Sequence, residues 1–142
     1  MNKYNAEGYA DPTAYGALSV IEKEEKAARP KFRPLVYICS RFAGDVPGNT
    51  EKAKEYSRFA VDNGAIPVAP HLLFPQFMDE GTERDLALFM GMVLLCRCAE
   101  IWVFGENRSE GMKAEIDKAV KRRMTVRYFT ENCEEVIQSC GN

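Results

Sequence analysis

A serine, a glycine and a glutamate occur at helical spacing in the segment S-E-G-M-K-A-E-I-D-K-A, residues 109–119. Ser109 is a favourable N-cap residue, and with Gly111 close behind it the first turn presents free backbone N–H groups. Those groups, together with the positive end of the helix dipole, can bind a phosphate or another anion. The alternative is an ordinary serine cap at which Gly111 has no role in binding.

Glu115 lies at the edge of the apolar face of the same helix. At 100° per residue, Met112, Ile116 and Ala119 form the inward stripe, and Glu115 falls roughly 80° from its centre. A carboxylate at this position can reach into a cleft while it is partly shielded from water. The alternative is a solvated glutamate at the boundary of the helix.

Two further titratable residues stand where secondary-structure elements begin or end. Asp85 follows Thr82 by three residues, in the first turn of a predicted helix, where an acid stabilises the positive helix end. It either has this role alone or supplies a second carboxylate to the same pocket. His71, the single histidine, follows a predicted strand and is either a hydrogen-bonded loop residue or a binding group.

Two loops can supply the remaining contacts with a ligand. Ser40 and Arg41 directly follow the first predicted strand, and Arg41 can either bind a phosphate or pair with Asp45 at the surface. Phe74 and Phe77 belong to a loop rich in large apolar residues. They either form a wall for a flat base or pack beneath their own loop.

From residue 34 onward, short apolar segments alternate with helical ones. We predict strands over 34–40, 65–70, 100–105 and 124–129, helices over 48–64, 83–99, about 110–123 and 131–139, and an apolar loop over 71–81. Buried-type strands separated by helices are typical of a parallel sheet built from right-handed βαβ units. The sequence therefore predicts a small α/β domain, doubly wound in the Rossmann or flavodoxin manner, with about four strands in the order 2-1-3-4 flanked by helices.

This strand order would place a crevice beyond the carboxyl ends of strands 1 and 3. Three loops border that crevice, over residues 40–45, 70–81 and 105–109. The candidate residues of the loops and of the helix after Ser109 would then meet in one pocket.

Residues 1–33 differ from the domain of residues 34–142 and are predicted to form an amphipathic helix and a linker. Asp11-Pro12 is typical of a helix start, and Pro30 ends the pattern. We expect this helix to pack against the main domain or a second subunit.

Composition excludes several classes of protein. The chain has a net charge of −2, so it lacks the basic field that binds duplex nucleic acid. No run of about 18 apolar residues and no signal-peptide core occurs, so we expect no membrane partner and a cytoplasmic location. Five cysteines and one histidine form no metal-binding pattern, which favours reduced thiols and no metal. Neither a Walker A loop nor a G-x-G-x-x-G motif occurs.

The helix predicted over 83–99 is apolar around most of its circumference. A four-stranded domain cannot cover so much apolar surface alone. We therefore expect a homodimer or a higher homo-oligomer.

Three motifs, in their order along the chain, are similar to the nucleoside 2-deoxyribosyltransferase superfamily. They are Y-I-C-S-R-F-A-G at 37–44, E-R-D-L at 83–86 and S-x-G-x-x-x-E-x-x-x-A at 109–119. The resemblance covers about residues 34–129 and extends to the deoxynucleoside-monophosphate N-glycosidase branch. In V-Y-I-C-S and A-P-H-L-L-F-P-Q-F the chain also resembles uncharacterised, often phage-borne relatives.

The resemblance implies roles for three residues in catalysis. Glu115 would attack C1′ of a sugar and form a covalent glycosyl-enzyme, which water or a second base then resolves. Asp85 would assist the departing base or hold the sugar. Tyr37 on the first strand would orient the nucleophile.

The resemblance also implies a phosphate site. In the monophosphate branch the phosphate is held by the loop after strand 1, here Ser40, Arg41 and Phe42, and by the helix cap, here Ser109 and Gly111. His71 would be a further substrate-binding residue.

We thus expect an enzyme that cleaves or transfers the N-glycosidic bond of a nucleoside or nucleoside 5′-monophosphate, with no metal or organic cofactor. One alternative is a non-catalytic nucleotide- or nucleotide-sugar-binding module that keeps the anion site and leaves Glu115 idle. Another is a small assembly protein whose apolar helices make a homodimer.

Overall fold

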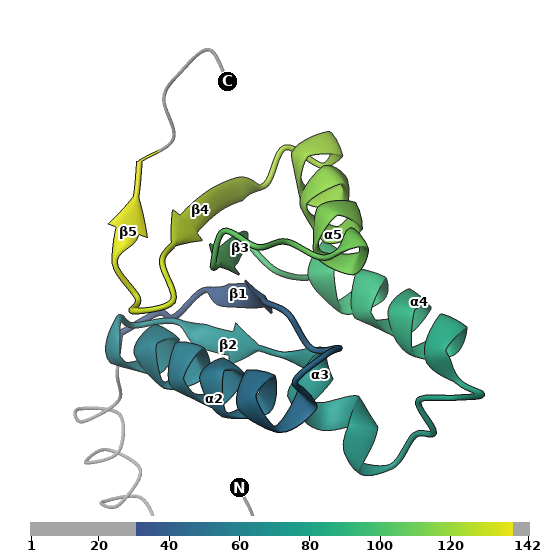
Figure 1. Cartoon of the computed structure of the whole chain (residues 1–142). Helices are drawn as coiled ribbons and strands as arrows, with labels where there is room; N and C mark the ends of the chain where they lie inside the picture. The colour runs from purple at the N-terminus through teal and green to yellow at the C-terminus, as the bar shows by residue number, and fades with distance from the viewer. Residues whose placement is uncertain (1–30, 138–142) are drawn as a thin grey trace, which may run out of the picture. The chain divides into compact units, whose positions relative to one another are not determined.

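Five strands form one sheet in the computed structural model, which describes residues 31–137 (Figure 1). The strands β1 (Leu35–Cys39), β2 (Ile66–Val68), β3 (Glu100–Phe104) and β4 (Thr125–Phe129) are parallel, and β5 (Glu135–Val136) runs antiparallel to β4. The order is β2-β1-β3-β4-β5. The predicted α/β class and the order of the four parallel strands are confirmed, whereas the fifth strand was not predicted. The predicted N-terminal helix lies outside the described residues.

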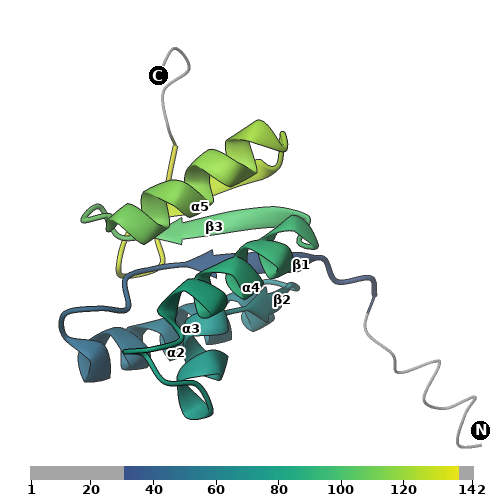
Figure 2. The same cartoon turned by 90° about the vertical axis from the view of Figure 1, so that its right-hand side faces the viewer.

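Helices cover both faces of the sheet, with α2 (Val46–Asp62) on one face and α4 (Arg84–Cys96) and α5 (Glu110–Lys121) on the other (Figures 1 and 2). The chain therefore leaves β1 toward one face and β3 toward the other. Such a divergence opens a crevice at the carboxyl ends of two adjacent strands. The sheet topology thus provides the predicted crevice.

Alternation along the strands assigns side chains to two separate cores, because successive strand residues point to opposite faces. On the α2 face, Tyr56 stacks on Phe104 at 4.2 Å between ring centroids, and Phe104 stacks on Phe129 at 4.9 Å. The core on the other face joins the buried residues Tyr37, Cys39, Leu95, Cys98, Ile101, Val103, Met112 and Ala119. The second core supports the crevice from below.

Specific capping residues mark the start and the end of α2. The Asp45 carboxylate caps the helix by accepting a hydrogen bond from the Gly48 N–H at 3.2 Å. The helix ends at Asp62 with Asn63 as its C-cap, and Gly64 follows with a φ of +82°, a left-handed conformation that favours glycine. The predicted helix over 48–64 is confirmed, and its observed end at Asp62 lies two residues before the predicted one.

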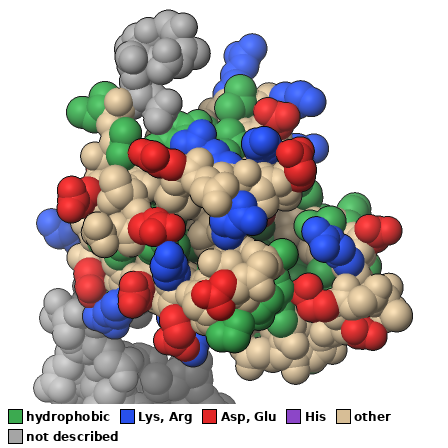
Figure 3. All heavy atoms as spheres, viewed as in Figure 1, with side chains coloured by type: hydrophobic (Ala, Val, Ile, Leu, Met, Phe, Trp, Pro, Cys, Tyr) green, Lys and Arg blue, Asp and Glu red, His purple; other side chains and the backbone are tan. Residues whose placement is uncertain are grey.

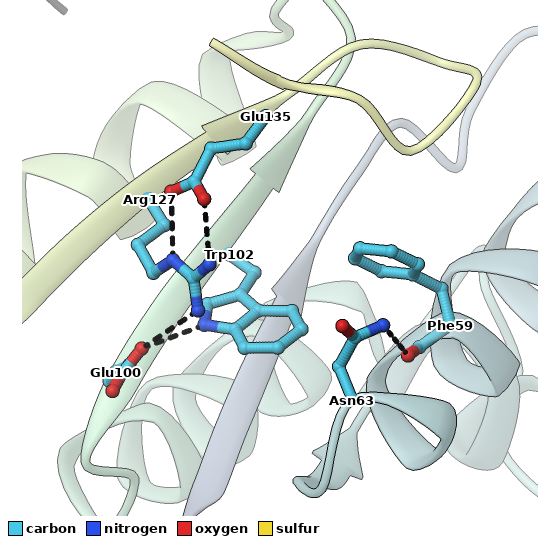
Figure 4. Close-up of polar contacts among 6 residues, drawn as sticks. All are labelled: Phe59, Asn63, Glu100, Trp102, Arg127 and Glu135. Carbon is cyan, nitrogen blue, oxygen red and sulfur yellow. Dashed lines mark hydrogen bonds and ion pairs between the residues drawn. The ribbon is translucent and has the colours of Figure 1, made fainter. Parts of the chain in front are cut away.

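Trp102 on the α2 face is covered by the Arg127 side chain as well as by Phe59 of α2, whose ring centroid lies 5.9 Å from that of Trp102 (Figure 4). The Arg127 guanidinium lies 4.8 Å from the centroid of the Trp102 ring, and its Nε and Nη2 donate to the Glu135 carboxylate at 2.8 and 2.7 Å. The Trp102 indole N–H donates to Glu100 at 2.9 Å. Glu135 of strand β5 thereby holds the Arg127 guanidinium over the aromatic core.

The final helix predicted over 131–139 is wrong for the described part of that range. Residues 131–134 form a turn in which the Thr130 N–H donates to the Glu134 carbonyl at 2.8 Å, and Cys133 has a φ of +62°. Glu135 then pairs with Phe129 as strand β5. Pairing along the open edge of β4 prevails over the local helical pattern.

The segment 71–81 is more ordered than the predicted loop. It contains the end of α3 (Pro70–Leu73) and the 3₁₀ helix η1 (Phe74–Gln76). Thr82 does not cap α4, because its hydroxyl donates to Asp79 and the residue before the helix is Glu83. At its other end α4 stops at Cys96, three residues before the predicted end.

Within the described residues no helix combines the length and apolarity needed to cross a membrane.

Leu95 joins α4 to the sheet and is 0% exposed. We expect Leu95→Ala to lower the free energy of unfolding by about 3 kcal/mol, because truncation leaves a cavity in a packed core. Val120→Ala, at a position that is 58% exposed on α5, is the matched control and should change stability by less than about 0.5 kcal/mol. Urea unfolding of both variants measures the difference, and equal effects would contradict this account of the core.

Candidate active site

A pocket of about 390 Å³ lies in the crevice, within the size range of small-molecule sites. Its floor includes Tyr37 of β1, and its sides come from the loop after β1, α3, η1, α4 and α5. Five large apolar side chains contribute to the walls: Phe42, Phe74, Leu88, Met92 and Met112. The pocket therefore combines apolar walls with polar groups at its base.

Glu115 reaches the base of this pocket from α5, as predicted from its place at the edge of the apolar face. The buried Tyr37 hydroxyl donates a hydrogen bond to Glu115 Oε2. The other carboxylate oxygen, Oε1, lies 3.6 Å from the Cys39 thiol, which is the second donor. Two neighbouring side chains on one face of β1 thus hold both oxygens of one carboxylate.

Burial raises the pKa of Glu115 to about 7, although the hydrogen bonds from Tyr37 and Cys39 act to lower it. At neutral pH the carboxylate is therefore close to half ionised. Burial and the nearby Glu115 also raise the pKa values of Tyr37 and Cys39, so both remain protonated donors. A poised carboxylate with fixed donors is an arrangement suited to nucleophilic or acid–base chemistry.

The start of α5 forms another part of the wall. Ser109 caps the helix by accepting a hydrogen bond from the Met112 N–H at 3.2 Å, as predicted. Ser109 and Gly111 both line the pocket. The N–H groups of the first turn have no partner within the helix, so this end can hold an anion or a hydroxyl. Glu110 adds a negative charge here, which Lys113 partly offsets at 3.4 Å.

His71 and Ser40 form a pair at the opposite side of the pocket. His71 Nε2 lies 3.0 Å from Ser40 Oγ, and burial lowers the pKa of His71 to about 4. The imidazole is neutral at pH 7, so it can orient a ligand but has no charge with which to bind a phosphate. Phe42 lies edge-on to His71 at 6.3 Å and also lines the pocket.

Two predicted site residues do not reach the pocket. Asp85 is exposed, because α4 directs Arg84 and Leu88 into the pocket and Asp85 lies one residue further around the helix. Arg41 points away to the third loop, where its Nη1 lies 3.4 Å from the Asn107 backbone oxygen and side-chain oxygen. Arg41 therefore does not pair with Asp45 either.

Of the two predicted wall aromatics, only one contributes to the pocket. Phe74 is buried and lines it, whereas Phe77 is 66% exposed and does not. Phe77 instead contacts Phe74 edge-on at 6.2 Å on the outer side.

Three further residues belong to the pocket or contact Glu115 and were not predicted from the sequence: Cys39, Glu80 and Arg84. Strand alternation places Cys39 on the same face as Tyr37, so this signal was present in the sequence. Among the pocket-lining residues of the described chain, Arg84 carries the single permanent positive charge. Residues 31–137 contain no cluster of three His, Cys, Asp or Glu side chains that could hold a metal ion.

A family model described as a domain of unknown function, DUF7768, matches residues 34–129. The match spans the strands and helices that build the pocket. No curated protein matches the sequence.

Proposed function

We propose that this chain, which belongs to the DUF7768 family of domains of unknown function, cleaves or transfers the N-glycosidic bond of a nucleoside or nucleoside 5′-monophosphate. The observation that carries the proposal is the Glu115 carboxylate at the base of a partly apolar pocket, where Tyr37 and Cys39 hold its two oxygens and burial raises its pKa. The resemblance to the nucleoside 2-deoxyribosyltransferase superfamily supports the same reaction.

In the proposed reaction, one Glu115 oxygen attacks C1′ of the sugar while the bond from C1′ to the base nitrogen breaks. The electron pair of that bond leaves with the base, which takes up a proton. Water or a second base then attacks C1′ and displaces the Glu115 oxygen, which gives the free sugar or a new nucleoside. The attacking group loses one proton, which balances the proton that the first base takes up. Either route returns Glu115 as a carboxylate.

The pocket walls suggest how each part of the substrate is bound. The apolar surface of Phe42, Phe74 and Met92 suits the face of a base. For a 5′-phosphate, the available partners are the first turn of α5 at Ser109 and the Arg84 guanidinium. Arg84 thus has the phosphate-binding role that the resemblance implied for Arg41.

A turnover assay tests this proposal. The protein is incubated with ribo- and deoxyribonucleosides and their 5′-monophosphates, with and without an acceptor base, and released or exchanged base is separated by chromatography. Release of free base supports the proposal, and the preferred substrate decides between nucleoside and nucleotide. Tight binding without turnover across the panel would favour a nucleotide-binding module and contradict the enzymatic proposal.

The structure and the resemblance predict different results for a substitution of Asp85, because its side chain is exposed. We expect Asp85→Asn to retain turnover within about threefold of the unmodified protein, because its side chain lies outside the pocket. Steady-state kcat and KM of the variant provide the measurement. A loss of 100-fold or more would show that Asp85 enters the pocket during the reaction.

A further inference from the structure

Helix α4 exposes an apolar stripe on the side away from the sheet. Of its thirteen residues, only Gly91 and Leu95 are buried. Leu86, Phe89 and Val93 are 48%, 65% and 44% exposed. Their spacing of three and four residues places them on one face of the helix.

The pocket does not explain this stripe. The pocket face of α4 contains Arg84, Ala87, Leu88, Gly91 and Met92. At 100° per residue, the direction of Leu86, Phe89 and Val93 is roughly opposite to that of Gly91 and Leu95. Figure 2 shows α4 nearest the viewer, and Figure 3 shows hydrophobic side chains on the surface in the region of α4 with charged side chains around them.

Opposite charges stand at the two ends of the stripe. Glu83 and Arg97 lie seven residues before and seven residues after Met90. Both fall along the same edge of the stripe at 100° per residue. Arg97 is exposed, and its guanidinium makes no ion pair or hydrogen bond with residues 31–137.

We propose that this stripe binds a second copy of the chain through antiparallel packing of α4 on α4 around a two-fold axis near Met90. A two-fold axis between antiparallel helices brings the same edge of both helices together. Glu83 of each copy then faces Arg97 of the other, so the arrangement makes the same ion pair twice.

The apolar residues are self-complementary in the same arrangement. Leu86 of one copy lies at the level of Val93 of the other, because these positions are nearly equidistant from Met90. The two Phe89 side chains meet close to the axis. A parallel arrangement would instead place Arg97 beside Arg97, so the charges favour the antiparallel one.

The dimer does not require the proposed reaction. The residues of the stripe lie outside the pocket, so an inactive protein would still form the dimer. The two proposals can therefore fail independently.

Sedimentation of the 142-residue chain over a range of concentrations tests the proposal. We expect a dimer for the unmodified chain and at least about 100-fold weaker self-association for Phe89→Glu, which places two like charges at the centre of the interface. Val120→Glu is the matched control, because it adds the same charge at an exposed apolar position on α5. A monomeric unmodified protein, or a dimer equally affected by both variants, would overturn the proposal.

The ion pairs provide a test that does not alter the apolar stripe. Arg97→Glu should weaken the dimer about tenfold, because each substitution affects two pairs. Combining it with Glu83→Lys should restore much of the affinity, since the opposite charges are then exchanged. Failure of the double variant to recover would overturn the antiparallel arrangement.

Discussion

Glu115→Gln is expected to abolish turnover, with kcat reduced at least about 10³-fold, because an amide cannot form the glycosyl ester. Glutamine has nearly the same shape, so Tyr37 can still donate to its carbonyl oxygen and the pocket keeps its walls. Substrate binding should therefore change much less than turnover. Parallel measurements of kcat and of equilibrium binding separate the two quantities.

The loss of activity should not come from a loss of folding. Because burial raises the pKa of Glu115 from 4.5 to about 7 in the folded protein, ionisation of Glu115 opposes folding as pH rises through that window. Glutamine cannot ionise, so we expect Glu115→Gln to be at least as stable as the unmodified protein at pH 8. Asp117→Asn, an exposed change on the same helix, is the matched control for activity.

Mass spectrometry gives a second readout of the same prediction. Protein quenched during turnover should carry one sugar on the peptide that contains Glu115, and the Gln variant should carry none. Full activity of Glu115→Gln, or a sugar attached to another residue, would exclude Glu115 as the nucleophile.

Tyr37→Phe is expected to move the pH dependence of turnover to higher pH. In the unmodified protein, kcat/KM should rise with pH up to a midpoint near 7 and then level off, because the ionised carboxylate is the nucleophile. The Tyr37 hydroxyl lowers the pKa of Glu115, so its removal raises that pKa and leaves less of the ionised form at low pH. We expect kcat/KM at pH 6 to fall about 10- to 100-fold.

The pH profile distinguishes positioning from packing. Phenylalanine keeps the aromatic ring in the core, where Tyr37 is 3% exposed, so the fold should be preserved. If Tyr37 only filled space, the variant would lose activity equally at all pH values or not at all. A midpoint that moves to lower pH would contradict the hydrogen bond as the means by which Tyr37 acts on Glu115.

The sheet was predictable because each parallel strand is a short apolar segment that local composition identifies. The position of Glu115 was predictable as well, since α5 has a clear apolar stripe that fixes how the helix is rotated. Helix α4 is apolar on several sides, because its apolar residues point to the pocket, the core and the solvent alike, so no single stripe marks the side that faces the sheet. Its rotation could not be read from periodicity, so the sequence left open whether Asp85 reaches the pocket, and the catalytic role of Asp85 was implied by the resemblance alone.

Contacts between segments far apart in the sequence account for the other differences between the predictions and the structure. Cys39 and Glu115 are 76 residues apart, and their contact depends on how α5 crosses β1. Strand β5 forms because Glu135 pairs with β4 and binds Arg127, neither of which the helical pattern around it indicates. Tertiary contacts decide such short segments more strongly than local propensity does.

The arginine-covered tryptophan has a practical consequence for all of these experiments. Trp102 is the single tryptophan of the chain, it is 3% exposed, and it lies on the face of the sheet opposite to Tyr37 and the pocket. Its fluorescence therefore reports on the integrity of the fold and the β4–β5 edge, free of other indoles and at a distance from bound ligand. Emission spectra recorded during an assay would then distinguish an inactive but folded variant from an unfolded one in the same cuvette.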